Sequence, residues 1–123
     1  MFKHILVPTD GSALSGKAIK QAVEVAKAIG AKITAFHVGK SYQPAALYGG
    51  FFMPPIPDLR KRFKEEVSKH AKKVLGLASA IAEKAGVPCD AVSAIGDAPY
   101  EAIIKQANKA KCDLIVMASH GRR

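Results

Sequence analysis

The sequence has 123 residues, 49% of them hydrophobic, and a formal net charge of +9. This length fits one domain, and the apolar share suffices for a core without disulfides or metals. No run of about 18 apolar residues and no signal-peptide pattern is present, so we expect a cytoplasmic protein without a membrane-spanning segment. Cys89 and Cys112 have no pairing or metal-ligand spacing, and we expect each to be a small buried apolar residue.

The first third of the sequence predicts strand, helix and strand. Residues 5–8 are a short apolar run closed by Pro8 and the turn-forming residues 10–12, which indicates a buried strand. Apolar residues recur at spacings of three and four over residues 12–29, which predicts an amphipathic helix with Ser12 as N-cap and Gly30 at its end. Residues 33–38 are β-branched and aromatic in character, as in a strand.

Residues 39–57 break this pattern. The stretch holds four prolines and three glycines together with five aromatic or methionine side chains. A loop this long is uncommon in a compact domain, and its aromatic content argues against plain disorder. We expect a lid or a subunit contact, with a locally collapsed loop as the alternative.

The remaining elements are a long helix, a strand, a short helix and a last strand. Residues 58–85 predict a helix about 40 Å long, whose first turns would project beyond the sheet. A strand over 91–95 follows, and then a helix over 99–109 with Ile103, Ile104 and Ala107 facing inward. Residues 114–118 are apolar at both alternating sets of positions, so we expect a strand covered on both faces.

The alternation of strands and helices predicts an α/β fold, an open, doubly wound parallel sheet with helices on both faces. In such sheets, ligands bind beyond the carboxyl ends of the strands, where the strand order reverses. The residues at those ends are therefore the candidate site: Pro8, Thr9 and Asp10 after the first strand, Val38 at the end of the second, and Met117, Ala118, Ser119, His120 and Gly121 after the last.

Two of these segments suggest nucleotide chemistry. Asp10 is either a turn residue or an acceptor for ribose or base donors, and it would suit a triphosphate only if a metal ion intervened. Gly121 would let backbone N–H groups approach phosphate oxygens, and Arg122 and Arg123 would supply charge. An ordinary strand-to-loop exit is the alternative. His120 is either beside the phosphate path or a structural histidine bonded to the loop.

At these positions the sequence resembles the universal stress protein family. The opening ILVPTDGS of residues 5–12 is similar to the family's first strand and turn. The segment DLIVMASHGR of residues 113–122 matches in the corresponding later position, and Gly96-Asp97-Ala98 fits before the third helix. The resemblance covers the whole chain in the right order.

The resemblance implies a Rossmann-like sheet of the adenine-nucleotide alpha hydrolase type, usually in a homodimer that acts in stress adaptation. One branch of the family binds ATP, alone or with Mg²⁺, at the strand ends. There the adenine meets the backbone at the position of Val38 and the side chain at that of Asp10. The phosphates meet a Gly-x2-Gly-x9-Gly-Ser/Thr run, which here would begin at Ala118-Ser119-His120-Gly121, with alanine in place of the first glycine.

The family pattern also continues past Arg123 into a last phosphate-binding glycine and a fifth strand. We therefore expect residues 1–123 to be a single universal stress protein domain that is incomplete at its C-terminus, with strand order 3-2-1-4. The fourth strand would then be an apolar edge, unless a partner strand covers it.

The leading hypothesis is an ATP-binding stress-response regulator without a dedicated catalytic site. The alternatives are a stress protein that acts through protein partners without ATP, and a slow ATPase. An adenylate-forming enzyme is disfavoured because Pro8-Thr9-Asp10-Gly11-Ser12 stands where such enzymes carry Ser-Gly-Gly-x-Asp-Ser. Nucleic-acid or acidic-protein binding through the basic residues 60–64 is also disfavoured, because charge alone supports it.

Overall fold

The computed structural model describes residues 3–39, 59–96 and 98–118. Seven elements follow one another along these residues. They are β1 (His4–Pro8), α1 (Ala13–Ile29), β2 (Lys32–Gly39), α3 (Leu59–Ala85), β3 (Cys89–Ile95), α4 (Pro99–Lys109) and β4 (Leu114–Ile115). All the predicted elements of the described segments are therefore present, with β3 two residues longer at its start than the sequence indicated.

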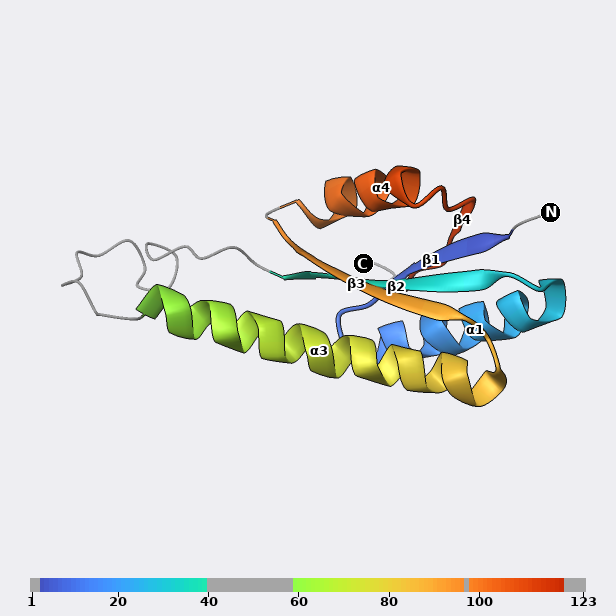
Figure 1. Ribbon diagram of the computed structural model, residues 1–123, viewed down its shortest axis with the longest axis horizontal. Coiled ribbons are helices and arrows are strands. Elements are labelled where there is room, and N and C mark those ends of the chain that lie inside the picture. Colours follow the sequence, from blue (N-terminus) through green and yellow to red (C-terminus); the bar gives the residue numbers. More distant parts are fainter. Residues whose placement is uncertain (1–2, 40–58, 97, 119–123) are drawn as a thin grey trace, which may run out of the picture.

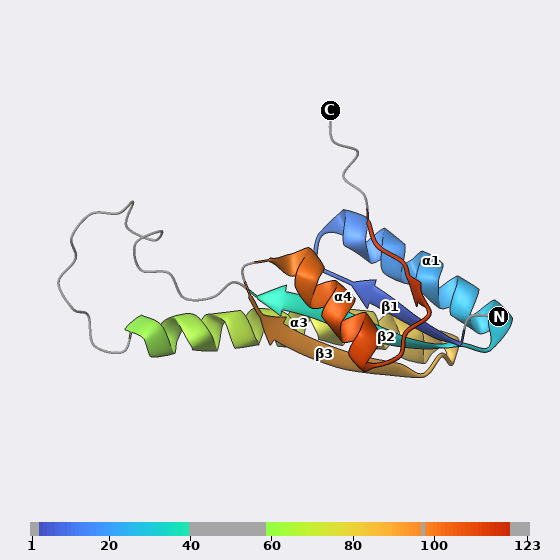
Figure 2. The same ribbon diagram turned by 90° about the horizontal axis from the view of Figure 1, so that it is seen from above.

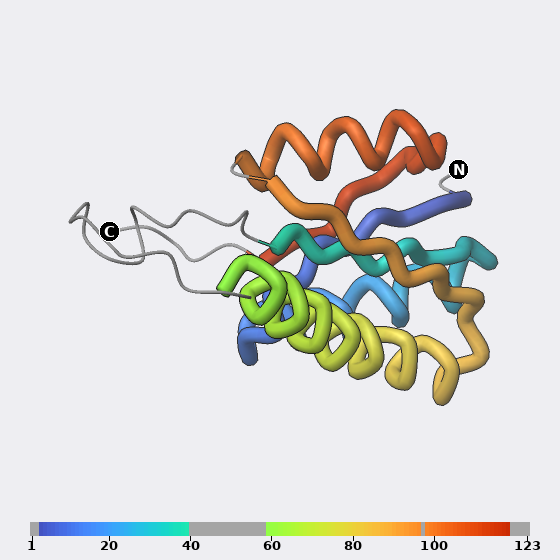
Figure 3. The backbone as a smooth tube through the Cα atoms, turned by 60° about the vertical axis from the view of Figure 1, so that its left-hand side comes forward, coloured from blue at the N-terminus to red at the C-terminus, as the bar shows by residue number. Residues whose placement is uncertain are grey.

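The strands form one parallel sheet in the order β3-β2-β1-β4. Helices α1 and α3 lie side by side on one face of the sheet, and α4 lies on the other (Figures 1 and 2). The same three layers are visible along the tube trace of Figure 3. The predicted open α/β sheet and its strand order are confirmed.

The alternation of side chains along the strands divides the core into two clusters. Ile5 and Val7 of β1 face α1 and α3, whereas Leu6 between them faces α4. On the first face, buried residues of the strands meet Val23 of α1 and Leu75 of α3. On the second face, Leu6 and Phe36 pack against Ile103 and Ala107 of α4.

The predicted ends of α1 are also confirmed. The hydroxyl oxygen of Ser12 accepts a hydrogen bond from the backbone N–H of Ser15 at 3.1 Å, as an N-cap does. Gly30 closes the helix in the left-handed region with φ of 73°. The two caps fix where the chain leaves β1 and where it enters β2.

Helix α3 extends past the sheet, as its length predicted (Figure 1). Its buried residues begin only at Ala71, and every described residue from Leu59 to His70 is exposed or half-buried. The apolar spacing of three and four continues through Phe63 and Val67, and Val67 lies against Gly39, the last residue of β2, where the strand ends. Periodicity thus predicted the helix, and the end of the sheet decided where burial stops.

Three expectations were wrong. The last strand comprises only Leu114–Ile115 instead of 114–118, and it is not covered on both faces, since Ile115 is 37% and Met117 55% exposed. Beyond the backbone bond from Val116 N–H to the carbonyl of Leu6, the chain departs from β1. Ile104 is 51% exposed because α4 turns Ile103 and Ala107 toward the sheet instead.

The third wrong expectation concerns the two cysteines, which are half-buried free thiols at the edge of the core instead of buried residues.

The predicted lid or subunit contact at 39–57 lies outside the described residues except for Gly39, which is the last residue of β2. No helix within the described segments is both long and apolar enough to cross a membrane.

Candidate functional site

A crevice opens at the carboxyl ends of β1 and β2, on the face of the sheet that carries α4. Its volume is about 290 Å³, and its walls are mainly apolar. Six of the residues predicted from the strand ends line it, namely Pro8, Thr9, Asp10, Val38, Met117 and Ala118. The structure therefore brings together residues that are more than 100 positions apart in the sequence.

The turn after β1 sets the position of Asp10. Its carboxylate accepts a hydrogen bond at 2.9 Å from the backbone N–H of Ser12, the residue that caps α1. Hydrogen bonds from Ser12 hold the pKa of Asp10 below its usual value, so the carboxylate is ionised at neutral pH. Asp10 is exposed, which leaves its remaining oxygen lone pairs available to a ligand.

Gly11 is required at the centre of this turn. Its φ of 86° lies in the left-handed region, and a Cβ there would come within 2.8 Å of the Val74 side chain of α3. A side chain at this position would push the turn away from α3 and move Asp10 with it.

Thr9 ties the end of β1 to its neighbours. Its backbone N–H donates to the carbonyl of Phe36 in β2 at 2.8 Å. Its hydroxyl lies 3.1 Å from that of Ser15 in α1, and both residues are buried. Thr9 thus fixes the floor of the crevice, and its side chain is already engaged in a hydrogen bond.

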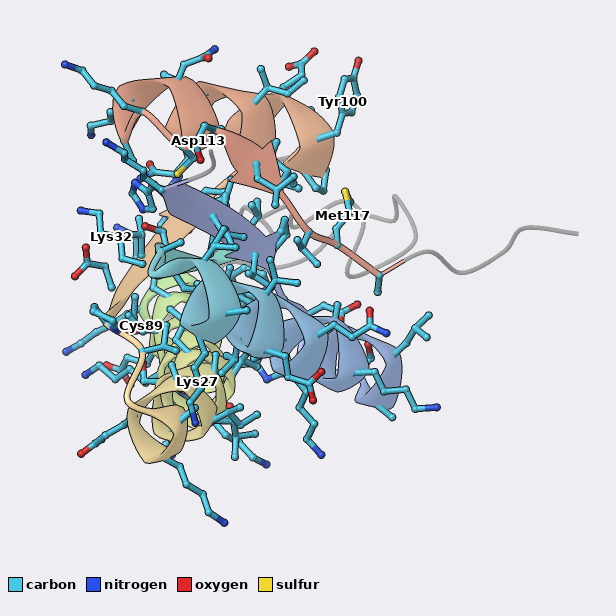
Figure 4. All side chains as sticks on the ribbon, turned by 90° about the vertical axis from the view of Figure 1, so that its right-hand side faces the viewer. Lys27, Lys32, Cys89, Tyr100, Asp113 and Met117 are labelled. Carbon is cyan, nitrogen blue, oxygen red and sulfur yellow. The ribbon has the colours of Figure 1, made fainter. Side chains whose placement is uncertain are left out.

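The opposite wall comes from α4 and from the segment that follows β4. Met117 and Tyr100 lie toward the same end of the sheet, and Asp113 lies at the other end, beside the start of β1 (Figure 4). The Asp113 carboxylate accepts backbone hydrogen bonds from Lys3 and His4, which join the start of β4 to β1. These bonds lower the pKa of Asp113.

Four residues of the crevice were missed from the sequence. These are Ser15, Phe36, Pro99 and Ile103. Phe36 could have been found, because it stands two positions from Val38 and so faces the same side of β2. Pro99 and Ile103 belong to α4, and only the packing of that helix across the strand ends places them in the wall.

Predicted residues Ser119, His120 and Gly121 lie outside the described residues. Within the described part of the chain, no group of three or more histidine, cysteine, aspartate or glutamate side chains could hold a metal ion. The crevice therefore presents apolar walls, one carboxylate and the strand-end backbone. A flat, partly apolar group with hydrogen-bond donors on its edge suits such a site.

On the other face of the same strand ends lies His37 of β2. It is 5% exposed, and within the described residues its Nδ1 has no hydrogen-bond partner. Its ring contacts that of His70 in α3 edge to face, with centroids 5.4 Å apart. Burial lowers the pKa of His37, the charge of His70 lowers it further, and Asp10 raises it.

An open α/β sheet with a crevice at its strand ends defines a class of ligand-binding proteins with many chemistries. The family model of the universal stress protein family matches residues 1–123. The universal stress protein YxiE of Bacillus subtilis is 34% identical over an alignment that covers 98% of this chain and 81% of that protein. The chain belongs to the universal stress protein family.

Solved structures show the same fold. A universal stress protein in complex with cAMP superposes with a TM-score of 0.67 at 24% identity, covering 94% of this chain and 75% of that one. A universal stress protein family protein of Arabidopsis thaliana with AMP bound superposes with a TM-score of 0.70 at 18% identity, covering 97% and 78%. At these identities the likeness concerns the fold.

Proposed function

We propose that this chain is a stress-response regulator that binds an adenine nucleotide, ATP in the first instance, in the crevice at the ends of β1 and β2. The observation that carries the proposal is the convergence of Asp10 and Val38 on one cavity with apolar walls. The adenine would lie against Val38 and Phe36, and the Asp10 carboxylate would accept hydrogen bonds from the base or the ribose. No dedicated catalytic group is part of the proposal.

The shape and chemistry of the crevice support this assignment. Its volume of about 290 Å³ is close to the lower end for small-molecule sites, and Asp10 is the one charged residue among its described lining. Relatives of the same fold that carry cAMP and AMP support an adenine nucleotide as the class of ligand. An anionic Asp10 favours the neutral base and sugar over the phosphates, which would lie toward Ala118.

Any Mg²⁺ would arrive with the phosphates of ATP, which bind this ion themselves. We further propose that residues 1–123 act as one domain, as a homodimer and in the cytoplasm. Sedimentation velocity with and without ATP tests the dimer.

The first experiment is to heat-denature the purified protein and identify any released nucleotide by chromatography and mass spectrometry. Titration calorimetry with ATP, ADP, AMP and cAMP then ranks the ligands. About one nucleotide per chain supports the proposal. An empty protein that takes up none of the four contradicts it and favours the alternative, a family member that acts through protein partners.

Asp10→Asn tests the assigned contact, since an amide oxygen can still accept the N–H of Ser12 and preserve the turn. A hydrogen bond to a charged group contributes about 1.5–3 kcal/mol, so we expect nucleotide affinity to fall about 10- to 100-fold. Asp90→Asn, at an exposed position of β3, is the matched control and should bind as the parent does. Equal affinities in the two variants would remove Asp10 from the site.

A phosphate-release assay with bound ATP separates pure binding from slow hydrolysis.

A further inference from the structure

A second cavity lies on the opposite face of the sheet, between α1 and α3. It holds about 390 Å³, which is more than the crevice proposed for the nucleotide. The two helices run side by side along this face (Figures 1 and 3). We call this cavity the α1–α3 groove, and the nucleotide proposal makes no use of it.

The walls of the α1–α3 groove are apolar. Ile19 comes from α1, and Val74, Leu77 and Ile81 come from α3. Leu77 is 57% exposed, so a large apolar side chain of this wall is open to solvent and could be covered by a ligand. The groove thus leaves apolar surface in contact with solvent between two helices that are otherwise packed together.

The polar groups of the groove fall into two kinds. The hydroxyls of Thr9, Ser12 and Ser15 are already hydrogen-bonded, with Thr9 to Ser15 at 3.1 Å and the Ser15 hydroxyl to the carbonyl of Ser12 at 3.0 Å. The charged residues among its described lining are Lys17 and Lys20, both on α1 and both exposed. No carboxylate lines this part of the described chain with them.

From this combination we infer that the α1–α3 groove binds a single-chain amphiphile with an anionic head, specifically a free fatty acid. The acyl chain would lie against the side chains of α3, and the carboxylate would pair with Lys17 and Lys20. Burial of apolar chain supplies the affinity, and the two lysines select the anionic head over a neutral one. Thr9 and Ser15 line both cavities, so the groove and the crevice are separated by one hydrogen-bonded pair.

Gly16 offers a way to block the groove. It lines the cavity, and a Cβ built on it meets no atom within 4 Å, so a larger side chain would occupy open space. Gly76 of α3 is a matched control. Its Cβ also meets nothing within 4 Å, it is exposed, and it is absent from the lining of the groove.

The test is titration calorimetry of the protein with octanoate, decanoate and laurate below their micelle concentrations. We expect saturable binding of one molecule per chain, tightening about fourfold for each added methylene. Gly16→Leu should weaken laurate binding at least about tenfold, and Gly76→Leu should leave it unchanged. If Gly16→Leu does not fold, Leu77→Glu, at an exposed position, replaces it and should weaken laurate binding in the same way.

The lysines are tested with Lys17→Gln/Lys20→Gln and with dodecanol as the uncharged probe. Exposed ion pairs contribute little, so we expect laurate to bind about two- to fivefold more weakly per lysine. Dodecanol binding should be unaffected, and Lys17→Arg/Lys20→Arg should bind laurate as the parent does. AMP binding should be the same in Gly16→Leu as in the parent, which separates this site from the nucleotide crevice. Laurate affinity that ignores chain length or Gly16→Leu would overturn the inference. So would a dimer that Gly16→Leu dissociates, because a second copy would then be the occupant.

Discussion

The two faces of the sheet are covered very differently. Among the described residues, thirteen buried side chains form the cluster under α1 and α3, whereas four form the cluster under α4. The crevice opens on the second face, where one short helix leaves the strand ends uncovered. Most of the buried apolar side chains thus lie on one face and the candidate nucleotide site on the other. Substitutions on the first face should therefore lower mainly stability, and substitutions on the second should also lower nucleotide affinity.

The largest effect is expected on the heavily covered face. Leu75→Ala removes a side chain that is 7% exposed, and we expect the free energy of unfolding to fall by about 2–5 kcal/mol. Leu77→Ala, two residues further along the same helix and 57% exposed, should cost less than about 1 kcal/mol. Urea denaturation of both variants measures the difference, and equal losses would show that this face does not carry the stability assigned to it.

On the face with α4 we expect a smaller loss coupled to binding. Ile103→Ala should lower the free energy of unfolding by about 2 kcal/mol, near the bottom of the range for such substitutions, because the site already opens into the crevice. It should also weaken nucleotide binding, which Leu75→Ala should not. Ile104→Ala, at the exposed neighbouring position, controls for the helix itself. If nucleotide affinity fell in Leu75→Ala and stayed unchanged in Ile103→Ala, the assignment of binding to the face with α4 would be wrong.

A third prediction concerns pH. The pKa of His37 is lowered from 6.5 chiefly by burial, so the unfolded chain binds more protons than the folded one below that value. The stability from neutral His37 is present above pH 6.5 and declines as the pH falls from there through its folded pKa. For one such group the slope is at most about 1.4 kcal/mol per pH unit.

His37→Gln should remove this pH dependence of the free energy of unfolding. Urea denaturation between about pH 7 and pH 5, the range around the ordinary pKa of histidine, measures it. Among the described residues, the charged and titratable groups around the ring are Asp10, Lys64 and His70. Asp10 and Asp113 act in a separate window, since their lowered pKa values give stability that is present above 3.8 and lost at more acid pH. An unchanged slope in His37→Gln would assign the pH dependence to another group.

The smallest effect is expected from helix propensity alone. Gly76→Ala should raise the free energy of unfolding by up to about 1 kcal/mol, because the position is helical and a Cβ there meets nothing within 4 Å. Gly86→Ala, just past the end of the same helix, should lower it by about 1–2 kcal/mol, since φ there is 76°. Thermal unfolding compares the two, and a gain in both would mean that the chain after α3 relaxes into another conformation.

Much of the fold followed from local patterns. The spacing of three and four over α1, the caps at Ser12 and Gly30, and the alternation of strand and helix each predicted what is found. Local patterns failed at β4. The apolar run 114–118 predicted a strand covered on both faces, but the chain pairs with β1 over two residues only. They failed again at Ile104, because a short helix does not show from its sequence which of two adjacent isoleucines meets the sheet.

The sequence by itself determined the elements, the parallel sheet and the strand-end residues of the crevice, because periodicity, caps and turn residues act over a few positions. Tertiary structure alone decided which face stays open, where burial along α3 begins, and that Thr9 separates two cavities. These features depend on segments distant in the sequence, such as Phe36 bonded to Thr9, and Met117 and Pro8 in the walls of one crevice. Only the packed chain brings such residues together, because their positions depend on how the helices settle on the finished sheet.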